Sequence, residues 1–136
     1  MRTWADYKKT MSFENVVFSL ARSGDLASLR EFGLTGDALN EKNTQGYSLL
    51  MLAVYNGNRD TARYLLTQGA DPNTADNQGS TALMGAAFKG ELALISLLCE
   101  FGANAAMKNF KGQSALDFAM MFEQAPVVQF LRSLNH

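Results

Sequence analysis

A regular period of about 33 residues between matching segments constrains this chain more than any other feature of its sequence. The segment at 79–92 reads GSTALMGAAFKGEL, and its pattern recurs one period earlier and, in part, one period later. The recurring positions hold glycine, a hydroxyl residue, leucine and alanine: Gly46, Ser48, Leu50, Ala53 and Gly57; Gly79, Thr81, Leu83, Ala86 and Gly90; Gly112, Ser114, Leu116 and Ala119. A fixed period of this length indicates stacked repeats instead of one closed core.

Helical spacing and capping residues predict a pair of helices in each repeat. Ser48, Thr81 and Ser114 precede apolar segments, where a hydroxyl group can accept a hydrogen bond from the first turn of a helix. Ser114 and Asp117 have the three-residue spacing of a capping box. We therefore expect an all-α solenoid of four stacked helix-turn-helix units with short hairpin or turn tips. The expected parts of this single domain at 1–136 are an N-terminal extension at 1–12 and repeats at about 13–42, 43–75, 76–108 and 109–136.

Matching positions also predict the core. The small side chains of Ala53, Ala86 and Ala119 allow neighbouring helices to approach closely, and a larger residue there is expected to overpack the stack. Most glycines mark the turns between helices, and in the last repeat Glu123 takes that place. Other aromatic side chains are expected to pack structurally: Phe18, Phe32, Phe101 and Phe130 between helices, and Trp4 against the first repeat.

The hexapeptide at 81–86, Thr-Ala-Leu-Met-Gly-Ala, matches three positions of the signature Thr-Pro-Leu-His-x-Ala. Together with the period, this hexapeptide resembles the ankyrin repeat, and the resemblance covers about residues 13–136. The residues chosen at these positions are also similar to those of short bacterial ankyrin proteins. Ser48–Ala53 and Ser114–Ala119 match less closely. No repeat keeps the proline or the histidine of the signature.

Composition excludes several function classes. The formal net charge is -1, with no clustered basic face of the kind that captures nucleic acid or anionic lipid. Cys99 is the only cysteine, so the fold does not depend on a disulfide. No segment approaches the roughly 18 apolar residues of a membrane helix. We expect a cytoplasmic monomer without nucleic acid or membrane partners, unless an export signal has been removed.

The residues offer little for catalysis. His136, the only histidine, is the last residue, so Ser-His, Cys-His and multi-histidine metal sites are not expected. We interpret Cys99 as a small buried hydrophobic residue, and Asp71, Asp76 and Asn77 as turn and cap residues. We therefore expect no enzyme activity, no metal site and no cofactor.

The resemblance implies a non-catalytic module that binds one partner protein in a concave groove, through hairpin tips and the inner face of the first helices. Carried over by alignment, the partner-binding residues are Arg22, Thr44, Gln45, Tyr47, Tyr55, Asn56, Asn77, Gln78, Ser80, Phe88, Lys89, Phe110, Lys111, Gln113, Met121 and Phe122.

Among these residues, four stand one period apart in succession: Arg22, Tyr55, Phe88 and Met121. Stacked repeats would align them as a stripe of one cation, two aromatic rings and a methionine, and aromatic and arginine side chains are typical of binding hot spots. Alternatively, Phe88 and Met121 fold inward as core residues, or merely interrupt a solvated face.

Three roles stay open at the level of sequence. The favoured role is an adaptor, inhibitor or immunity factor, or accessory protein that acts on a partner. The alternative is a haem- or oxidative-stress-linked accessory of a catalase-type enzyme, since short bacterial ankyrin proteins are linked to catalases. The third is a purely structural or self-associating repeat.

Overall fold

The computed structural model describes residues 14–134, with side chains from residue 16 onward, and the expectations for Trp4, His136 and the extension at 1–12 lie outside this range. The chain divides into two compact units, one up to Ala70 and one from Asp71 onward. The described residues form helices joined by turns, with two isolated β-bridges between Lys42 and Ser48 and between Ala75 and Thr81. This confirms the all-α fold class.

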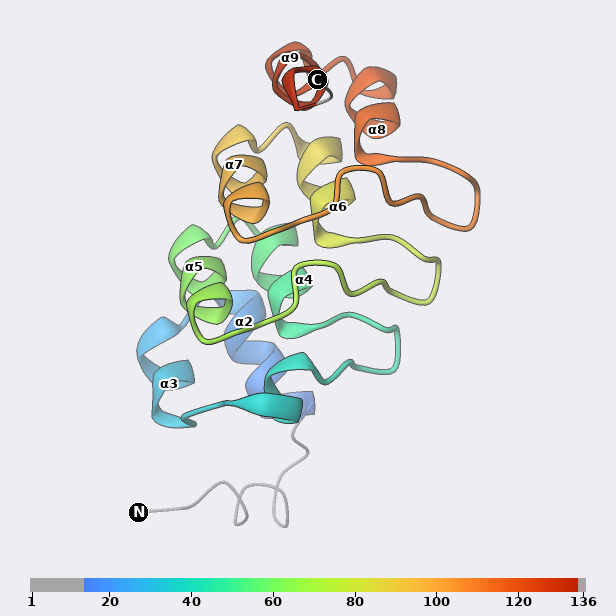
Figure 1. Ribbon diagram of the computed structural model, residues 1–136. Coiled ribbons are helices and arrows are strands. Elements are labelled where there is room, and N and C mark those ends of the chain that lie inside the picture. Colours follow the sequence, from blue (N-terminus) through green and yellow to red (C-terminus); the bar gives the residue numbers. More distant parts are fainter. Residues whose placement is uncertain (1–13, 135–136) are drawn as a thin grey trace. The chain divides into compact units, whose positions relative to one another are not determined.

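The first unit contains two layers of helices (Figure 1). The π-helix η1 (Glu14–Phe18) leads into α2 (Ser19–Ser23), which is followed by α3 (Leu26–Glu31) and the 3-10 helix η2 (Gly36–Asn40). The second layer consists of α4 (Leu49–Tyr55) and α5 (Arg59–Thr67). Because α2 packs against α4 and α3 against α5, the apolar faces of the two layers share one core.

The second unit repeats this arrangement. Its first layer is α6 (Ala82–Lys89) with α7 (Leu92–Glu100), and its second layer is α8 (Ala115–Met121) with α9 (Ala125–Ser133). Helix α8 packs against α6, and α9 packs against α7. Within each unit, residues one period apart therefore occupy matching places in adjacent layers.

The predicted caps are confirmed. The amide of Met51 donates to Ser48 Oγ at 3.1 Å, and the amide of Met84 donates to Thr81 Oγ1 at 3.4 Å. At α8 the capping box is complete, since the Asp117 amide donates to Ser114 Oγ at 3.2 Å and the Ser114 amide donates to Asp117 Oδ2 at 2.9 Å. Each cap satisfies an amide that the first helical turn leaves without a partner.

The core positions follow the period. Ala53, Ala86 and Ala119 are fully buried, and Phe18 is buried as expected. Phe32 and Phe130 are half-buried. The prediction for Phe101 was wrong: it follows the last residue of α7, and 36% of its side chain is exposed because the helix ends there.

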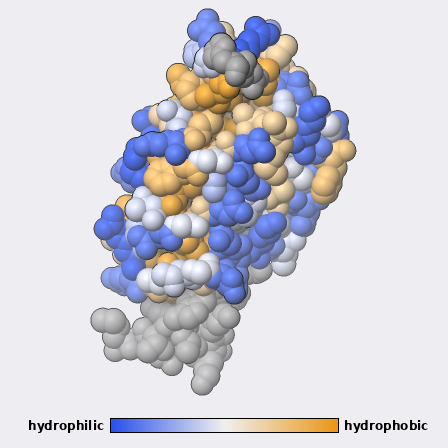
Figure 2. Space-filling model, in the orientation of Figure 1, coloured by the Kyte–Doolittle hydropathy of each residue, from blue (hydrophilic) through white to orange (hydrophobic). Residues whose placement is uncertain are grey.

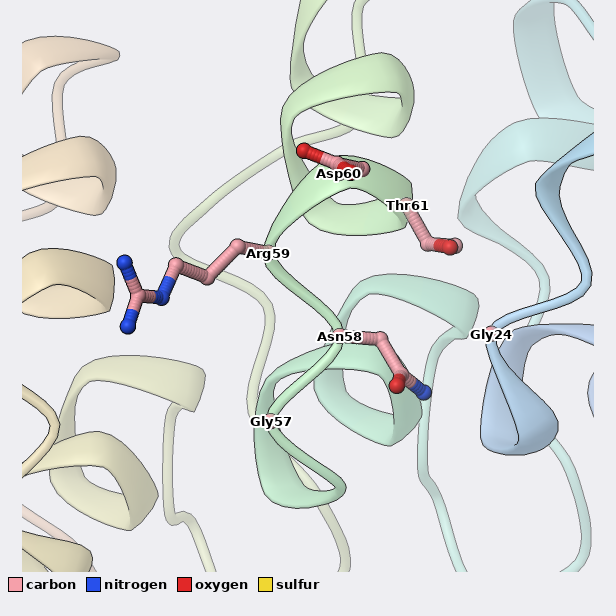
Figure 3. A pocket seen from close by; sticks show the side chains of 6 residues that line it. All are labelled: Gly24, Gly57, Asn58, Arg59, Asp60 and Thr61. Atoms are coloured by element: carbon pink, nitrogen blue, oxygen red, sulfur yellow. The ribbon is translucent and has the colours of Figure 1, made fainter.

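Side-chain amides join the two layers of each unit at the turns. In the first unit Asn58 Nδ2 donates to the carbonyl oxygens of Ala21, at 3.2 Å, and Arg22, at 3.0 Å. Figure 3 shows the Asn58 side chain directed at Gly24, where a β-carbon would lie 2.7 Å from Asn58 Cγ. In the second unit Gln124 Nε2 donates to the Phe88 carbonyl oxygen at 3.1 Å and occupies the space beside Gly90. These amides cap the carbonyl ends of α2 and α6, which their own helices cannot satisfy.

Candidate partner-binding groove

In the last three repeats, one residue shapes each hairpin tip. Asn43, Asp76 and Asn109 stand one period apart, and each accepts backbone amides two and four residues later through its side-chain oxygen. All six hydrogen bonds are between 2.8 and 3.0 Å long. Such turns fix the backbone of the tip while leaving the intervening side chains in solvent.

The two tips of the second unit are joined to each other. The Phe110 amide donates to the Gln78 carbonyl oxygen at 3.0 Å. The Phe110 ring lies over Gly79, where a β-carbon would be 2.8 Å from Phe110 Cδ1. This ring is supported by the neighbouring tip and remains 80% exposed.

The other predicted residues of the second unit, those outside the tips, lie at the ends of helices α6 and α8. Phe88, near the end of α6, and Phe122, directly after α8, are 45% and 44% exposed, and their ring centroids lie 4.4 Å apart at an interplanar angle of 74°. Met121 is 57% exposed, and Gln113 Nε2 donates to its sulfur at 3.6 Å. Phe88 and Met121 are therefore surface residues, and the alternative that they fold into the core was wrong.

Tips and helices together enclose a groove of about 480 Å³. Its lining residues are Asn77, Gln78, Ser80, Phe88, Asn109, Phe110, Lys111, Gln113, Phe118, Met121 and Phe122. Nine of these residues were predicted from the sequence, and only Lys89 of the predicted residues in this unit is not among them. Lys111 carries the only formal charge in the lining.

Two lining residues, Asn109 and Phe118, are missing from the set predicted by sequence. For Asn109 a signal existed, because its place one period after Asp76 marks it as the residue that shapes the tip. Phe118 stands within the apolar segment of α8, where its sequence position does not separate a groove residue from a core residue. It replaces the small Gly85 of the preceding repeat and is half-buried.

The predicted residues of the first unit lie on matching elements. Tyr47, at the tip, and Tyr55, at the end of α4, form an edge-to-face pair with centroids 5.7 Å apart at 89°. Asn56 Nδ2 donates to the Leu52 carbonyl oxygen at 2.8 Å. The remaining predicted residues of this unit are exposed: Arg22, Thr44 and Gln45. The continuous stripe of Arg22, Tyr55, Phe88 and Met121 stays a prediction.

The described residues hold no group of three or more His, Cys, Asp or Glu side chains that could bind a metal ion. Cys99, expected to be buried, is only half-buried on α7, and this partial burial raises the pKa of its thiol. A thiol with a raised pKa is a weak nucleophile at neutral pH. None of the helices in the described range is both long and apolar enough to cross a bilayer.

A family model described as "Ankyrin repeats (3 copies)" matches residues 17–109 and 50–136. The chain belongs to the ankyrin repeat family. Ankyrin repeats are a protein-protein interaction fold, and the family is generally non-catalytic.

Curated relatives include bacterial ankyrin proteins. A putative ankyrin repeat-containing protein of Treponema pallidum is 44% identical over 78 residues, which is 57% of this chain and 26% of the relative. A putative ankyrin repeat protein of Rickettsia felis is 29% identical over 121 residues, 87% of this chain and 40% of the relative. A mouse "Protein fem-1 homolog A-like" is 33% identical over 93 residues, 68% of this chain and 14% of the relative. The chain thus spans less than half the length of these relatives. The alternative of a catalase-linked accessory finds no support among them.

Proposed function

We propose that this ankyrin repeat protein is a non-catalytic adaptor, inhibitor or accessory that holds one partner protein in the groove of its second unit. The observation that supports this is the exposure of four large apolar side chains around a single groove: Phe88, Phe110, Met121 and Phe122, each at least 44% exposed. Apolar groups gathered in this way are typical of interaction sites, whereas scattered ones need no explanation.

The groove is preorganised in the unbound protein. Hydrogen bonds to Asp76 and Asn109 hold the tips, and the ring contact between Phe88 and Phe122 restricts both side chains. Binding then orders few rotamers, so little of the interaction free energy is lost to conformational entropy.

The lining also suggests the chemistry of the partner. Gln78 also lines the groove, and its side-chain amide can hydrogen-bond an extended backbone. Lys111 is the only charged lining residue. We therefore expect the partner to insert an apolar anchor residue with an acidic residue beside it. As part of the same proposal, the four repeats act as a single domain in the cytoplasm.

The test compares variants of the full chain for binding to a protein recovered by wild-type pull-down. We expect Phe88→Ala to weaken the affinity, measured by titration calorimetry, by about 2 kcal/mol, as is common for a hot-spot aromatic residue. Leu92→Ala is the matched control, because Leu92 is 39% exposed on α7 and does not line the groove. Equal affinity of the wild type and Phe88→Ala, or loss of binding in Leu92→Ala, would disprove the groove assignment.

A further inference from the structure

The outer face of the last helix pair carries apolar side chains at positions that are buried one repeat earlier. Met120 follows Ala87 by one period, and Val128 follows Ile95 by the same distance in sequence. Ala87 and Ile95 are fully buried in the layer that α8 and α9 cover, whereas Met120 is 49% exposed and Val128 is half-buried. The face formed by α8 and α9 therefore has the character of a stacking surface.

In a repeat stack each layer buries its apolar face against the next layer. Here the outer face exposes Met120, and Figure 2 shows hydrophobic and hydrophilic residues side by side near the top, where the last helix pair lies. An exposed stacking surface favours a contact that covers it.

The face has a definite layout along α9. Ala125, Val128, Gln129 and Arg132 are spaced i, i+3, i+4 and i+7, which places them on one side of the helix. With Met120 and Glu123 they line a shallow hollow of about 440 Å³. Glu123 lies just before the start of α9, Arg132 lies in its last turn, and the apolar residues are between them. From Ala125 to Arg132 the helix rises by about 10 Å.

This order of charges makes the face complementary to itself. If two copies meet across a two-fold axis with their α9 helices antiparallel, Glu123 of each copy lies beside Arg132 of the other, and Val128, midway between them, meets its counterpart. A parallel arrangement would place like charges together. Within residues 14–134, Glu123 and Arg132 make no side-chain hydrogen bond or ion pair.

We propose that this end face is a homodimer interface, in which α9 of one copy packs antiparallel against α9 of a second copy. In that case the monomer predicted from the sequence is the form present at low protein concentration. The contact is independent of the groove, because the two surfaces share no lining residue.

The test is the molar mass of the full chain, measured by light scattering over a wide range of concentration. We expect the mass to rise from 14.9 kDa toward twice that value. Glu123→Lys or Arg132→Glu alone places two like-charge pairs in the dimer, so either variant should stay near 14.9 kDa. The double variant restores both pairs with reversed sign and should recover the dimer.

Glu31→Lys is the control, because it makes the same charge change at an exposed position of the first unit and should dimerise like the wild type. Circular dichroism shows whether each variant is folded. A wild type that stays at 14.9 kDa at every concentration overturns the proposal. Association that survives the single reversals, or that the double reversal does not restore, overturns it too. Because no partner protein is added, a failure here leaves the groove proposal standing.

Discussion

Phe122 and Phe88 meet edge to face, with ring centroids 4.4 Å apart, although the two residues come from different repeats. Both side chains are nearly half exposed, so this ring contact lies at the surface and not in the core. This pair links the ends of α6 and α8, and both rings line the groove.

The ring contact should be measurable as a coupling in stability. We expect a double-mutant cycle of Phe88→Ala and Phe122→Ala, followed by urea unfolding, to give a coupling of about 0.5–1.5 kcal/mol in the free energy of unfolding. A second cycle of Phe88→Ala with Phe101→Ala serves as the reference, because Phe101 is similarly exposed but lies at the end of α7. Equal coupling in the two cycles would show that the ring contact contributes nothing of its own.

Gly90 and Gln124 should be coupled for a steric reason. Gly90 has φ of +74°, and the Gln124 amide lies where a β-carbon would be. Gly90→Ala should therefore lower the free energy of unfolding by about 1–2 kcal/mol from the left-handed backbone, and further by displacing the amide from the Phe88 carbonyl. In a Gln124→Ala background only the backbone part should remain. Thermal unfolding of the wild type, Gly90→Ala, Gln124→Ala and the double variant separates the backbone cost from the cost of displacing the amide. If Gly90→Ala lowers the stability equally with and without Gln124, the amide is not displaced.

Interactions of this fold could be predicted from the sequence where they are local or repeat with the period. Ser48, Thr81 and Ser114 cap helices that begin at the next residue, so a short motif was enough to place them. Nine groove residues of the second unit were found because the period maps each repeat on its neighbour. The hydrogen bond from Gln124 to Phe88 spans 36 residues and depends on where the turn directs one side chain, so no local pattern revealed it. The exposure of Phe101 depends in the same way on where α7 ends.

The capping box of α8 should make stability depend on pH. The hydrogen bonds from the Ser114 amide and hydroxyl lower the pKa of Asp117 below its ordinary value of 3.8. A carboxylate whose pKa is lower in the folded state stabilises the fold above the unfolded pKa, and this contribution is lost as the pH falls through the folded pKa. We expect the stability difference between the wild type and Asp117→Asn to be present at neutral pH and to disappear well below pH 3.8.

Carboxyl carbon NMR gives a direct measurement of the same effect. The pKa of Asp117 should lie below 3.8 in the wild type and return toward that value in Ser114→Ala, which removes the hydroxyl donor and acceptor. An Asp117 pKa that does not respond to Ser114→Ala would mean that the Ser114 hydroxyl does not contribute to the shift.

Gly79 and Gly112 offer a matched pair for testing whether the Phe110 ring shapes the binding groove. They occupy the same place in successive tips, with φ of +79° and +78°, so an alanine at either position has the same backbone cost. Only at Gly79 would the new β-carbon meet a side chain, since it would lie 2.8 Å from Phe110 Cδ1, whereas nothing lies within 4 Å at Gly112. We expect both variants to lose thermal stability, and Gly79→Ala to lose more because its β-carbon would also lie 3.1 Å from the Phe110 backbone nitrogen. Only Gly79→Ala should weaken partner binding in calorimetry, because it lifts the ring from the tip. If both variants bind like the wild type, the position of Phe110 does not matter for recognition, and the groove is formed by the helix residues alone.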